Sequence, residues 1–368
     1  MKLLLLAGEE SGVLYARRIA EEVRGRVPSA EIRGYGDYGF ETSDLAVIGL
    51  FAVLRRIRFF LGVKRTMERA IDEWKPDAVC TVDYPGMNLK LAAYAKARGV
   101  RTVHVVCPQV WAWKEGRIPK IEASLDKLCC FFPFEPKLFK PGFAEFVGHP
   151  LVDEMAGEPG CEGRKTEDGR RLLAILPGSR MGEIEKHLPV LLEVVETLQK
   201  EMSELKVAIP AADERAYQAI VSRVSRLMSS LGAVEIRLGG AREILRSADA
   251  AVVASGTATL EAALAGCPTV LVYKVGRLFA FLARRMIRGV RHLGLANIIA
   301  EKAGAPCPMP ELLQEDFTAG EILQYVSPWL TDGAANAAAR RALADTMKLL
   351  RSDGSAIARI ADCVLSGV

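Results

Sequence analysis

The sequence lacks the motifs that bind metal ions, and it has few histidines. Its four histidines are isolated from one another, and no H-E-x-x-H or D-x-D stretch occurs. Its eight cysteines form no C-x-x-C pair and no disulfide framework. We therefore expect a chain without a metal or other cofactor, whose cysteines are small buried hydrophobic residues in a reducing cytoplasm.

Long apolar runs are also missing, although hydrophobic residues make up 50% of the chain. No stretch approaches the roughly 20 uninterrupted apolar residues that a membrane-spanning helix needs. The run Leu3–Ala7 is too short for a signal peptide, and Glu9 and Glu10 follow at once. We expect a soluble or peripheral protein that uses this run as its first buried strand.

Apolar runs alternate with segments of helical length along the 368 residues, a length that suits two domains. This alternation is typical of parallel α/β sheets. The predicted strands are 2–7, 77–82, 101–107, 127–132, 172–176, 205–209, 234–238, 248–254 and 269–273. Residues 157–171, rich in glycine, proline and charge, predict a linker. We expect one domain over 1–160, completed by a C-terminal helix over 340–368, and another over 170–335.

Two loops in the second half have the composition of phosphate-binding turns. Each follows a predicted strand and opens a helical segment, so that backbone N–H groups and a positive helix end would face an anion. The candidate residues are Gly178, Ser179 and Arg180 in the first loop, and Ser255, Gly256, Thr257, Ala258, Thr259 and Glu261 in the second. Arg180 suits a phosphate, and Glu261 suits ribose hydroxyls. Either loop alone could be an ordinary strand-to-helix turn, but the pair favours a nucleotide diphosphate.

In the first half, glycine and acidic residues follow two predicted strands. The turn Gly8-Glu9-Glu10-Ser11-Gly12 comes directly after the first strand, where the backbone could approach a substrate closely. Asp83 comes after the second strand and is placed to accept a proton from an attacking hydroxyl. Capping of a helix that starts near Asn88 is an equal alternative for this residue. Gly34–Gly39 matches G-x-G-x-x-G, but the loop-like residues after it argue against a dinucleotide site.

Eleven of the 49 basic residues lie in two stretches without acids, between Asp44 and Glu68 and between Glu261 and Glu301. The candidate membrane contacts are Arg55, Arg56, Arg58, Phe59 and Phe60 in the first stretch, and Phe279, Phe281, Arg284, Arg285 and Arg288 in the second. Arginines beside large apolar residues favour the surface of an anionic membrane, where each cation adds about 1 kcal/mol of binding. The alternative is a core helix with a solvated basic face. Nucleic acid is disfavoured because stacking platforms are missing.

Several short blocks of the sequence together identify a protein family when they occur in a fixed order. They are Gly8–Gly12, Val82–Pro85, Pro108–Trp113, Phe132–Glu135, Gly148–Pro150, Leu176–Arg180 with Glu183, and Ser255–Glu261. In this order they resemble the lipid A disaccharide synthase family. Three positions where that family usually has acids are Val13, Ala52 and Gly86 here.

The resemblance implies an α/β protein of the GT-B fold, in which two Rossmann-like doubly wound domains face a cleft. It implies an inverting, metal-independent transfer of 2,3-diacylglucosamine from its UDP donor to 2,3-diacylglucosamine 1-phosphate. The products would be the β-1,6-linked lipid A disaccharide 1-phosphate and UDP. The first domain would face the acceptor and the membrane, and the second would bind the UDP-sugar. Such an enzyme would be cytoplasmic and peripheral on the inner face of the inner membrane.

The resemblance also implies roles for single residues. Asp83 would be the base, and Arg180 would stabilise the departing diphosphate in place of a metal. Asn297 would belong to the UDP site together with the two loops. The acceptor side of the cleft would be lined by Gly8, Glu9, Ser11, Gly12, Gln109, Trp111 and His149.

Three alternatives stay open at this point. A divergent paralogue could use a UDP-sugar with a different membrane-bound acceptor, and a non-catalytic relative could bind only lipid or nucleotide. The C-terminal helix could complete its own first domain or exchange into a second copy, so a homodimer is also open.

Overall fold

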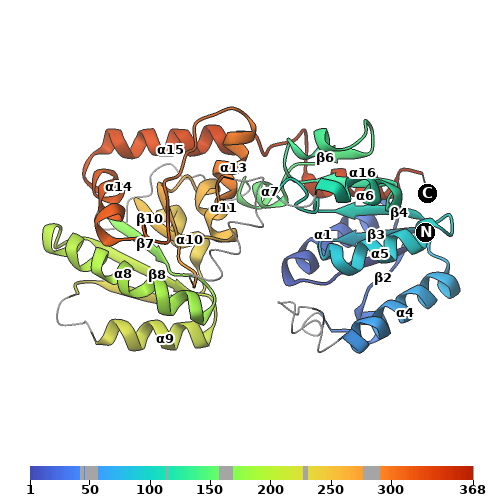
Figure 1. Cartoon of the computed structure of the whole chain (residues 1–368), viewed down its shortest axis with the longest axis horizontal. Helices are drawn as coiled ribbons and strands as arrows, with labels where there is room; N and C mark the ends of the chain where they lie inside the picture. The colour runs from blue at the N-terminus through green and yellow to red at the C-terminus, as the bar shows by residue number, and fades with distance from the viewer. Residues whose placement is uncertain are drawn as a thin grey trace. The chain divides into compact units, whose positions relative to one another are not determined.

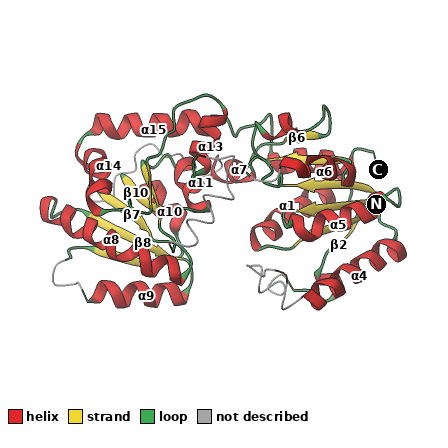
Figure 2. Ribbon diagram, viewed as in Figure 1, coloured by secondary structure: helices red, strands yellow, loops and turns green. Residues whose placement is uncertain are grey.

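The computed structural model describes residues 1–41, 45, 57–112, 115–156, 169–226, 231–276 and 291–367. The chain forms two compact units (Figure 1). Unit 1 comprises Met1–Asp153 and Leu350–Val368, and unit 2 comprises Glu154–Leu349. In each unit, helices flank the strands of one parallel sheet (Figure 2).

The sheet of unit 1 has the strand order β2-β1-β3-β4-β5-β6 in the described part of the chain. Its strands are β1 (Lys2–Ala7), β2 (Glu31–Arg33), β3 (Ala78–Val82), β4 (Arg101–Val105), β5 (Lys127–Cys130) and β6 (Ala144–Phe146). All neighbouring pairs are parallel. The order reverses between β1 and β3, and a ligand of such a sheet binds beyond the carboxyl ends of the strands at that point.

Helices cover both faces of this sheet. In the described residues they are α1 (Glu10–Arg26), α4 (Ile57–Trp74), α5 (Pro85–Lys96), α6 (Ile118–Ser124) and α16 (Ala356–Leu365), with short 3₁₀ turns at Gly36–Tyr38, Glu115–Arg117 and Glu135–Leu138. The chain passes from unit 1 to unit 2 within α7 (Pro150–Ala156). Because side chains alternate along a strand, Leu3 and Leu5 of β1 pack with α1 and α16, while Leu4 and Leu6 pack with α4 and α5. Burial on both faces explains why β1 and β3 are continuous apolar runs.

The sheet of unit 2 has the order β12-β11-β10-β7-β8-β9 over the residues described. Its strands are β7 (Leu172–Leu176), β8 (Lys206–Ala211), β9 (Val234–Leu238), β10 (Ala250–Ala254), β11 (Thr269–Tyr273) and β12 (Glu311–Leu313). Its helices are α8 (Met181–Glu201), α9 (Glu214–Ser225), α10 (Ala241–Ser247), α11 (Thr257–Leu264), α13 (Leu295–Lys302), α14 (Ala319–Thr331) and α15 (Gly333–Lys348). Here the order reverses between β7 and β10, the strands that precede the two predicted phosphate loops.

The predicted α/β class with parallel sheets is confirmed, and every predicted strand overlaps an observed one. Sequence reasoning missed β2, β6 and β12, three-residue strands whose length is too short for a periodic signal. None of the helices within the described ranges combines the length and the apolarity needed to cross a bilayer. The predicted linker lies mostly outside the described residues.

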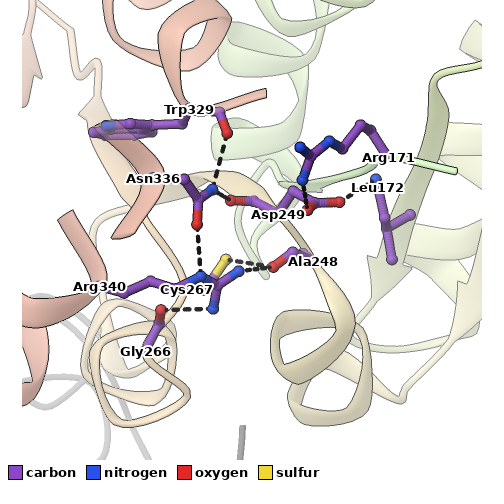
Figure 3. A network of polar contacts seen from close by, with 9 residues as sticks. All are labelled: Arg171, Leu172, Ala248, Asp249, Gly266, Cys267, Trp329, Asn336 and Arg340. Atoms are coloured by element: carbon purple, nitrogen blue, oxygen red, sulfur yellow. Dashed lines mark hydrogen bonds and ion pairs between the residues drawn. The ribbon is translucent and has the colours of Figure 1, made fainter. Parts of the chain in front are cut away.

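Instead of one helix over 340–368, the tail contains α15, a bend and α16. Gly354 lies in the bend with a φ of +87°. Arg340 of α15 donates to the carbonyls of Ala248 (2.8 Å) and Gly266 (2.9 Å), and Asn336 donates to those of Asp249 and Trp329 (Figure 3). These bonds fix α15 to unit 2, whereas α16 packs against α1 in unit 1.

Candidate functional site

A cavity of about 600 Å³ lies in unit 2, beyond the carboxyl ends of β7, β8, β9 and β10. From the predicted set, its lining includes Gly178, Ser179, Arg180, Ser255, Gly256, Thr257, Ala258 and Glu261. Further lining residues come from the loops after β8 and β9, among them Gly239, Gly240 and Arg242. The point where the strand order reverses therefore brings the two predicted loops together on one cavity.

The first loop is shaped by Gly178 and by the start of α8. Gly178 has a φ of +115°, and a Cβ atom there would lie 2.8 Å from the Cβ of Glu183. The backbone N–H of Arg180 donates to Glu183 Oε2 (3.4 Å), and the N–H of Glu183 donates to the carbonyl of Arg180 (2.9 Å). The Arg180 side chain is 65% exposed and lies 3.2 Å from Glu183 Oε1. A flexible guanidinium at a helix N-terminus is suited to bind an anion.

His187 holds this loop in place, a role that sequence reasoning missed. The backbone N–H of Lys274 donates to its Nε2 (3.0 Å), so Nδ1 carries the proton and donates to the carbonyl of Pro177 (2.8 Å). Burial lowers the pKa of His187, against the effect of its hydrogen bonds to Pro177 and Lys274. The neutral ring thus ties the loop after β7 to the end of β11.

The second loop turns at Gly256, which has a φ of +156°, and continues into α11. Thr259 is buried and donates from Oγ1 to the Gly256 carbonyl (2.8 Å), so its side chain shapes the turn and is not part of the cavity lining. The starts of α8 and α11 both line the cavity, and two helix N-termini at one cavity are suited to a diphosphate.

Glu261 on α11 is held by Arg242 on α10, a residue that sequence reasoning missed. Arg242 Nε donates to Glu261 Oε1 (2.8 Å), and Nη1 donates to Glu154 Oε2 (2.9 Å). The pKa of Arg242 is raised: burial acts to lower it, but the hydrogen bonds to Glu261 and Glu154 outweigh burial. The only sequence signal was the position of Arg242 just after the Gly239-Gly240 turn.

Asn297 lies elsewhere in this structure. Its side chain is buried, donates to the Met309 carbonyl and to Glu311 Oε1 (both 2.8 Å), and accepts from the Met309 N–H (3.0 Å). It is not among the described residues that line the cavity. Its side chain holds the segment before β12, and its membership of the UDP site stays a prediction.

In unit 1, the ends of β1 and β3 meet at the reversal of strand order and carry Gly8 and Asp83. A Cβ atom on Gly8 would lie 2.7 Å from Cδ1 of Tyr84, so the close approach requires glycine. Asp83 and Tyr84 have φ values of +50° and +49°, and Val106 at the end of β4 has +75°. Each such residue costs on the order of 1–3 kcal/mol, and strain of this kind clusters at functional sites.

Buried Asn88 stabilises this strained turn. Its Nδ2 donates to the carbonyls of Val82 (3.1 Å) and Asp83 (2.8 Å) and, more weakly, to that of Leu6 (3.3 Å). Its Oδ1 accepts from the Tyr35 hydroxyl (2.8 Å). One amide therefore joins the ends of β1 and β3, and sequence reasoning had no signal for it beyond the polar residue in a helix start.

The carboxyl group of Asp83 accepts from the Tyr84 N–H (2.8 Å). Tyr84 is the residue before α5, and no side chain caps this helix, so the capping alternative for Asp83 is wrong. Burial raises the pKa of Asp83, against the Tyr84 hydrogen bond. Burial, and secondarily the charge of Asp83, raises the pKa of Glu9. Two neighbouring carboxyl groups with raised pKa values are suited to proton transfer.

Other residues predicted for the acceptor side lie in different environments. Ser11 and Gln109 are exposed. Gly12 is buried, and a Cβ atom there would lie 3.5 Å from the carbonyl oxygen of Val82. Trp111 is buried and contacts Phe134 edge to face. His149 is also buried, its Nδ1 accepts from the Leu151 N–H (3.2 Å), and burial lowers its pKa to about 4. It caps α7 as a neutral ring, and its place on the acceptor side stays a prediction.

Glu135 fixes Trp111 from within the core. Its Oε1 accepts from Trp111 Nε1 and its Oε2 from the Phe132 N–H, both at 3.1 Å. Cys107 and Cys130 lie beside it, and the three potential ligand atoms are within 4.8 Å of one another. Each Glu135 oxygen already accepts a hydrogen bond, and burial raises the pKa of the Cys130 thiol. Glu135 therefore serves here as the acceptor that holds Trp111.

The pKa of Glu135 is raised from 4.5 to about 8, because burial disfavours its charge more than the hydrogen bonds from Phe132 and Trp111 favour it. Since the folded-state pKa exceeds the unfolded one, its stabilising contribution is complete below pH 4.5 and is lost as the pH rises to about 8. We expect the free energy of unfolding to fall by a few kcal/mol over this range, and Glu135→Gln to flatten the fall. Denaturant titrations at several pH values measure the free energy of unfolding. An equal dependence of this free energy on pH in both proteins would contradict the prediction.

The first basic stretch is described from Ile57 onward, in α4. Ile57 (47% exposed) and Leu61 (48%) lie on its outer face, and Arg58, Arg65 and Arg69 are exposed on the same face. Phe60 is buried and Phe59 is half-buried against Phe40, so the prediction of both as membrane contacts is wrong for Phe60. The remaining membrane candidates lie outside the described residues: Arg55, Arg56, Phe279, Phe281, Arg284, Arg285 and Arg288.

The family model for lipid-A-disaccharide synthetase matches residues 3–360. Curated relatives named lipid-A-disaccharide synthase include those of Xanthomonas campestris pv. campestris strain 8004 (36% identity, 89% of this chain and 78% of the relative) and Xylella fastidiosa (36%, 89% and 88%). The synthase of Syntrophus aciditrophicus is 34% identical over 87% of each chain.

Solved structures with lower sequence identity share the fold. The S. aureus MnaA–UDP co-structure aligns with a TM-score of 0.62 and 12% identity over 98% of this chain and 95% of that one. Acinetobacter baumannii MurG aligns with a TM-score of 0.60 and 14% identity over 99% of each chain. The likeness confirms the predicted two-domain α/β fold of the GT-B class.

Proposed function

Because the chain belongs to the lipid-A-disaccharide synthetase family, it is a glycosyltransferase that forms the lipid A disaccharide, and we propose that its two units divide this reaction. Unit 2 binds the UDP part of UDP-2,3-diacylglucosamine, and unit 1 binds and activates 2,3-diacylglucosamine 1-phosphate. The single observation that carries the proposal is the cavity where both predicted phosphate loops meet.

The donor side follows from the cavity chemistry. The N-termini of α8 and α11 and the Arg180 guanidinium supply positive charge for the diphosphate. Glu261 supplies the acceptor for ribose hydroxyls. When the sugar–phosphate bond breaks, the same groups stabilise the charge that develops on UDP, which is the work that a divalent metal does in other transferases.

The acceptor side follows from the strained turn after β3. The backbone of Asp83 is fixed by Asn88, so its carboxyl group is presented in one orientation at the strand end. In its ionised form it takes the proton from the acceptor hydroxyl as that oxygen attacks the anomeric carbon. Direct attack from the face opposite UDP inverts the configuration and gives the β-1,6 linkage.

The outer face of α4 supports a peripheral position on the inner face of the inner membrane. Two exposed aliphatic side chains lie among three arginines on that face, an arrangement suited to an anionic lipid surface. Acylated substrates are held in such a surface, so a docked enzyme meets them where they reside.

We expect a variant with Ile57→Ser, Leu61→Ser, Arg58→Ser and Arg65→Ser to lose most of its binding to anionic vesicles, because it removes both apolar contact and charge. Cosedimentation with vesicles of anionic and neutral lipid measures it, at low and high salt. Substitution of the exposed Arg215 and Arg223 on α9 in unit 2 provides a control of equal charge loss per residue. Equal binding of wild type to both vesicle types at all salt concentrations would exclude charge-driven docking.

The function is tested by incubating the protein with both diacylated substrates in detergent and determining the mass of the lipid product. We expect a tetraacyl disaccharide 1-phosphate and one equivalent of UDP. Consumption of the donor only when another lipid acceptor is added would exclude the proposed acceptor. UDP binding without any transfer would exclude the proposed role of Asp83.

A further inference from the structure

The acid assigned to ribose in the cavity of unit 2 has a fixed orientation. Glu261 is only 16% exposed, and its Oε1 accepts from Arg242 Nε at 2.8 Å. This hydrogen bond uses one carboxylate oxygen and leaves Oε2 as the acceptor for a ligand. Arg242 and Glu261 both line the cavity, so the pair faces whatever binds there.

Arg242 is in turn anchored on its other side. Its Nη1 lies 2.9 Å from Oε2 of Glu154, whose side chain is only 6% exposed. Glu154 belongs to α7, the helix in which the chain passes from unit 1 to unit 2. A guanidinium with donors on two edges can hold two carboxylates at once, which an ammonium group cannot do with the same geometry.

We propose that Arg242, held by Glu154, is a positioning residue that orients Glu261 for the two ribose hydroxyls and thereby sets the preference for ribonucleotides over 2′-deoxyribonucleotides. The inference rests on the proposed donor site. The same guanidinium lies between two acids, and without it the Glu261 carboxylate loses the hydrogen bond that fixes its orientation. Oε2 is then a poorer acceptor for the hydroxyls.

Comparison of UDP with 2′-deoxyUDP tests the inference, because the two differ only in the hydroxyl concerned. We expect wild type to bind UDP about tenfold more tightly or better, the usual effect of a hydrogen bond to a charged group. In Arg242→Met, we expect this ratio to fall to about threefold or less, because 2′-deoxyUDP has only the 3′-hydroxyl contact with Glu261 to lose and its affinity falls less than that of UDP. Arg242→Lys should retain part of the ratio. Isothermal titration calorimetry measures each affinity.

Arg242→Met removes the Arg242 hydrogen bond to the buried Glu154 carboxylate and could destabilise the fold. The double variant Arg242→Met/Glu154→Gln also removes the Glu154 charge, so it tests the orientation of Glu261 in a protein in which that charge no longer faces the substituted side chain. Arg215→Met, on the exposed face of α9, is the matched control and should behave as wild type. The thermal midpoint of each variant shows that it is folded.

Each outcome bears on the inference. A ratio that stays at the wild-type value in both the single and the double variant overturns it, as does a wild type that binds UDP without preferring it. Loss of affinity for both nucleotides to the same extent would make Arg242 a direct ligand and overturn the positioning role. Failure of wild type to bind any uridine diphosphate would instead overturn the proposed donor site.

Discussion

Asp83→Asn should lower turnover by about a hundredfold or more and leave UDP affinity within about twofold of wild type. A carboxylate that accepts the proton of an attacking hydroxyl contributes this much to a rate, and an amide cannot replace it. Asparagine has the same shape, tolerates the φ of +50°, and can still accept from the Tyr84 N–H. The turn after β3 should therefore survive. Single-turnover rates and UDP titrations separate the two effects.

The dependence of activity on pH, measured for wild type and Asp83→Asn, distinguishes a catalytic base from a structural residue. The base must be ionised, so wild-type activity falls as the pH drops through the pKa of Asp83. Burial raises that pKa, and the fall should begin at a higher pH than for an ordinary carboxyl group. The residual activity of Asp83→Asn should lack this limb. Asp353→Asn, in the exposed bend before α16, is the control for a neutralised aspartate. Activity of Asp83→Asn within a few-fold of wild type would remove the residue from the mechanism.

The sheets could be predicted because their central strands are buried on both faces. Leu3 to Leu6 alternate between two cores, which forces a continuous apolar run, and β10 is likewise a run of buried alanines and valines. The polar residues that end these strands were visible for the same reason. Edge strands such as β12 and the break at Gly354 depend on tertiary contacts, so a pattern along the chain does not reveal them.

Within the candidate site, the residue types in the sequence predicted where the loops lie. They predicted less well what surrounds each side chain. His149 and Trp111 lie inside recognisable blocks, and Asn297 has a polar amide, yet the observed partners of these side chains are backbone groups or a buried acid. The prediction of Phe60 as a membrane contact was wrong because one helical face of α4 packs on the core and the adjacent face is exposed. Arg242 and Asn88 act across elements distant in sequence, and only the fold brings their partners together.

Arg180→Ala should weaken UDP binding by about 1.5–3 kcal/mol, which corresponds to about a 10- to 150-fold rise in Kd. The side chain lines the cavity and, among the residues that the structure describes, forms its ion pair with Glu183 at the start of α8. It can move to a phosphate at small cost, because an exposed ion pair contributes little. Arg180→Lys should lose less, since it keeps the charge but not the bidentate geometry.

Turnover by Arg180→Ala should fall more than the loss of UDP affinity alone accounts for, because charge on the diphosphate increases as the sugar leaves. Arg215→Ala, on the exposed face of α9, should change neither quantity.

If Arg180 and the helix N-termini carry the leaving-group charge, excess EDTA should leave wild-type turnover unchanged. Strong inhibition by EDTA that Mg²⁺ restores would show that a metal shares this task. UDP affinity of Arg180→Ala equal to that of wild type would show that the guanidinium does not contact the diphosphate at all.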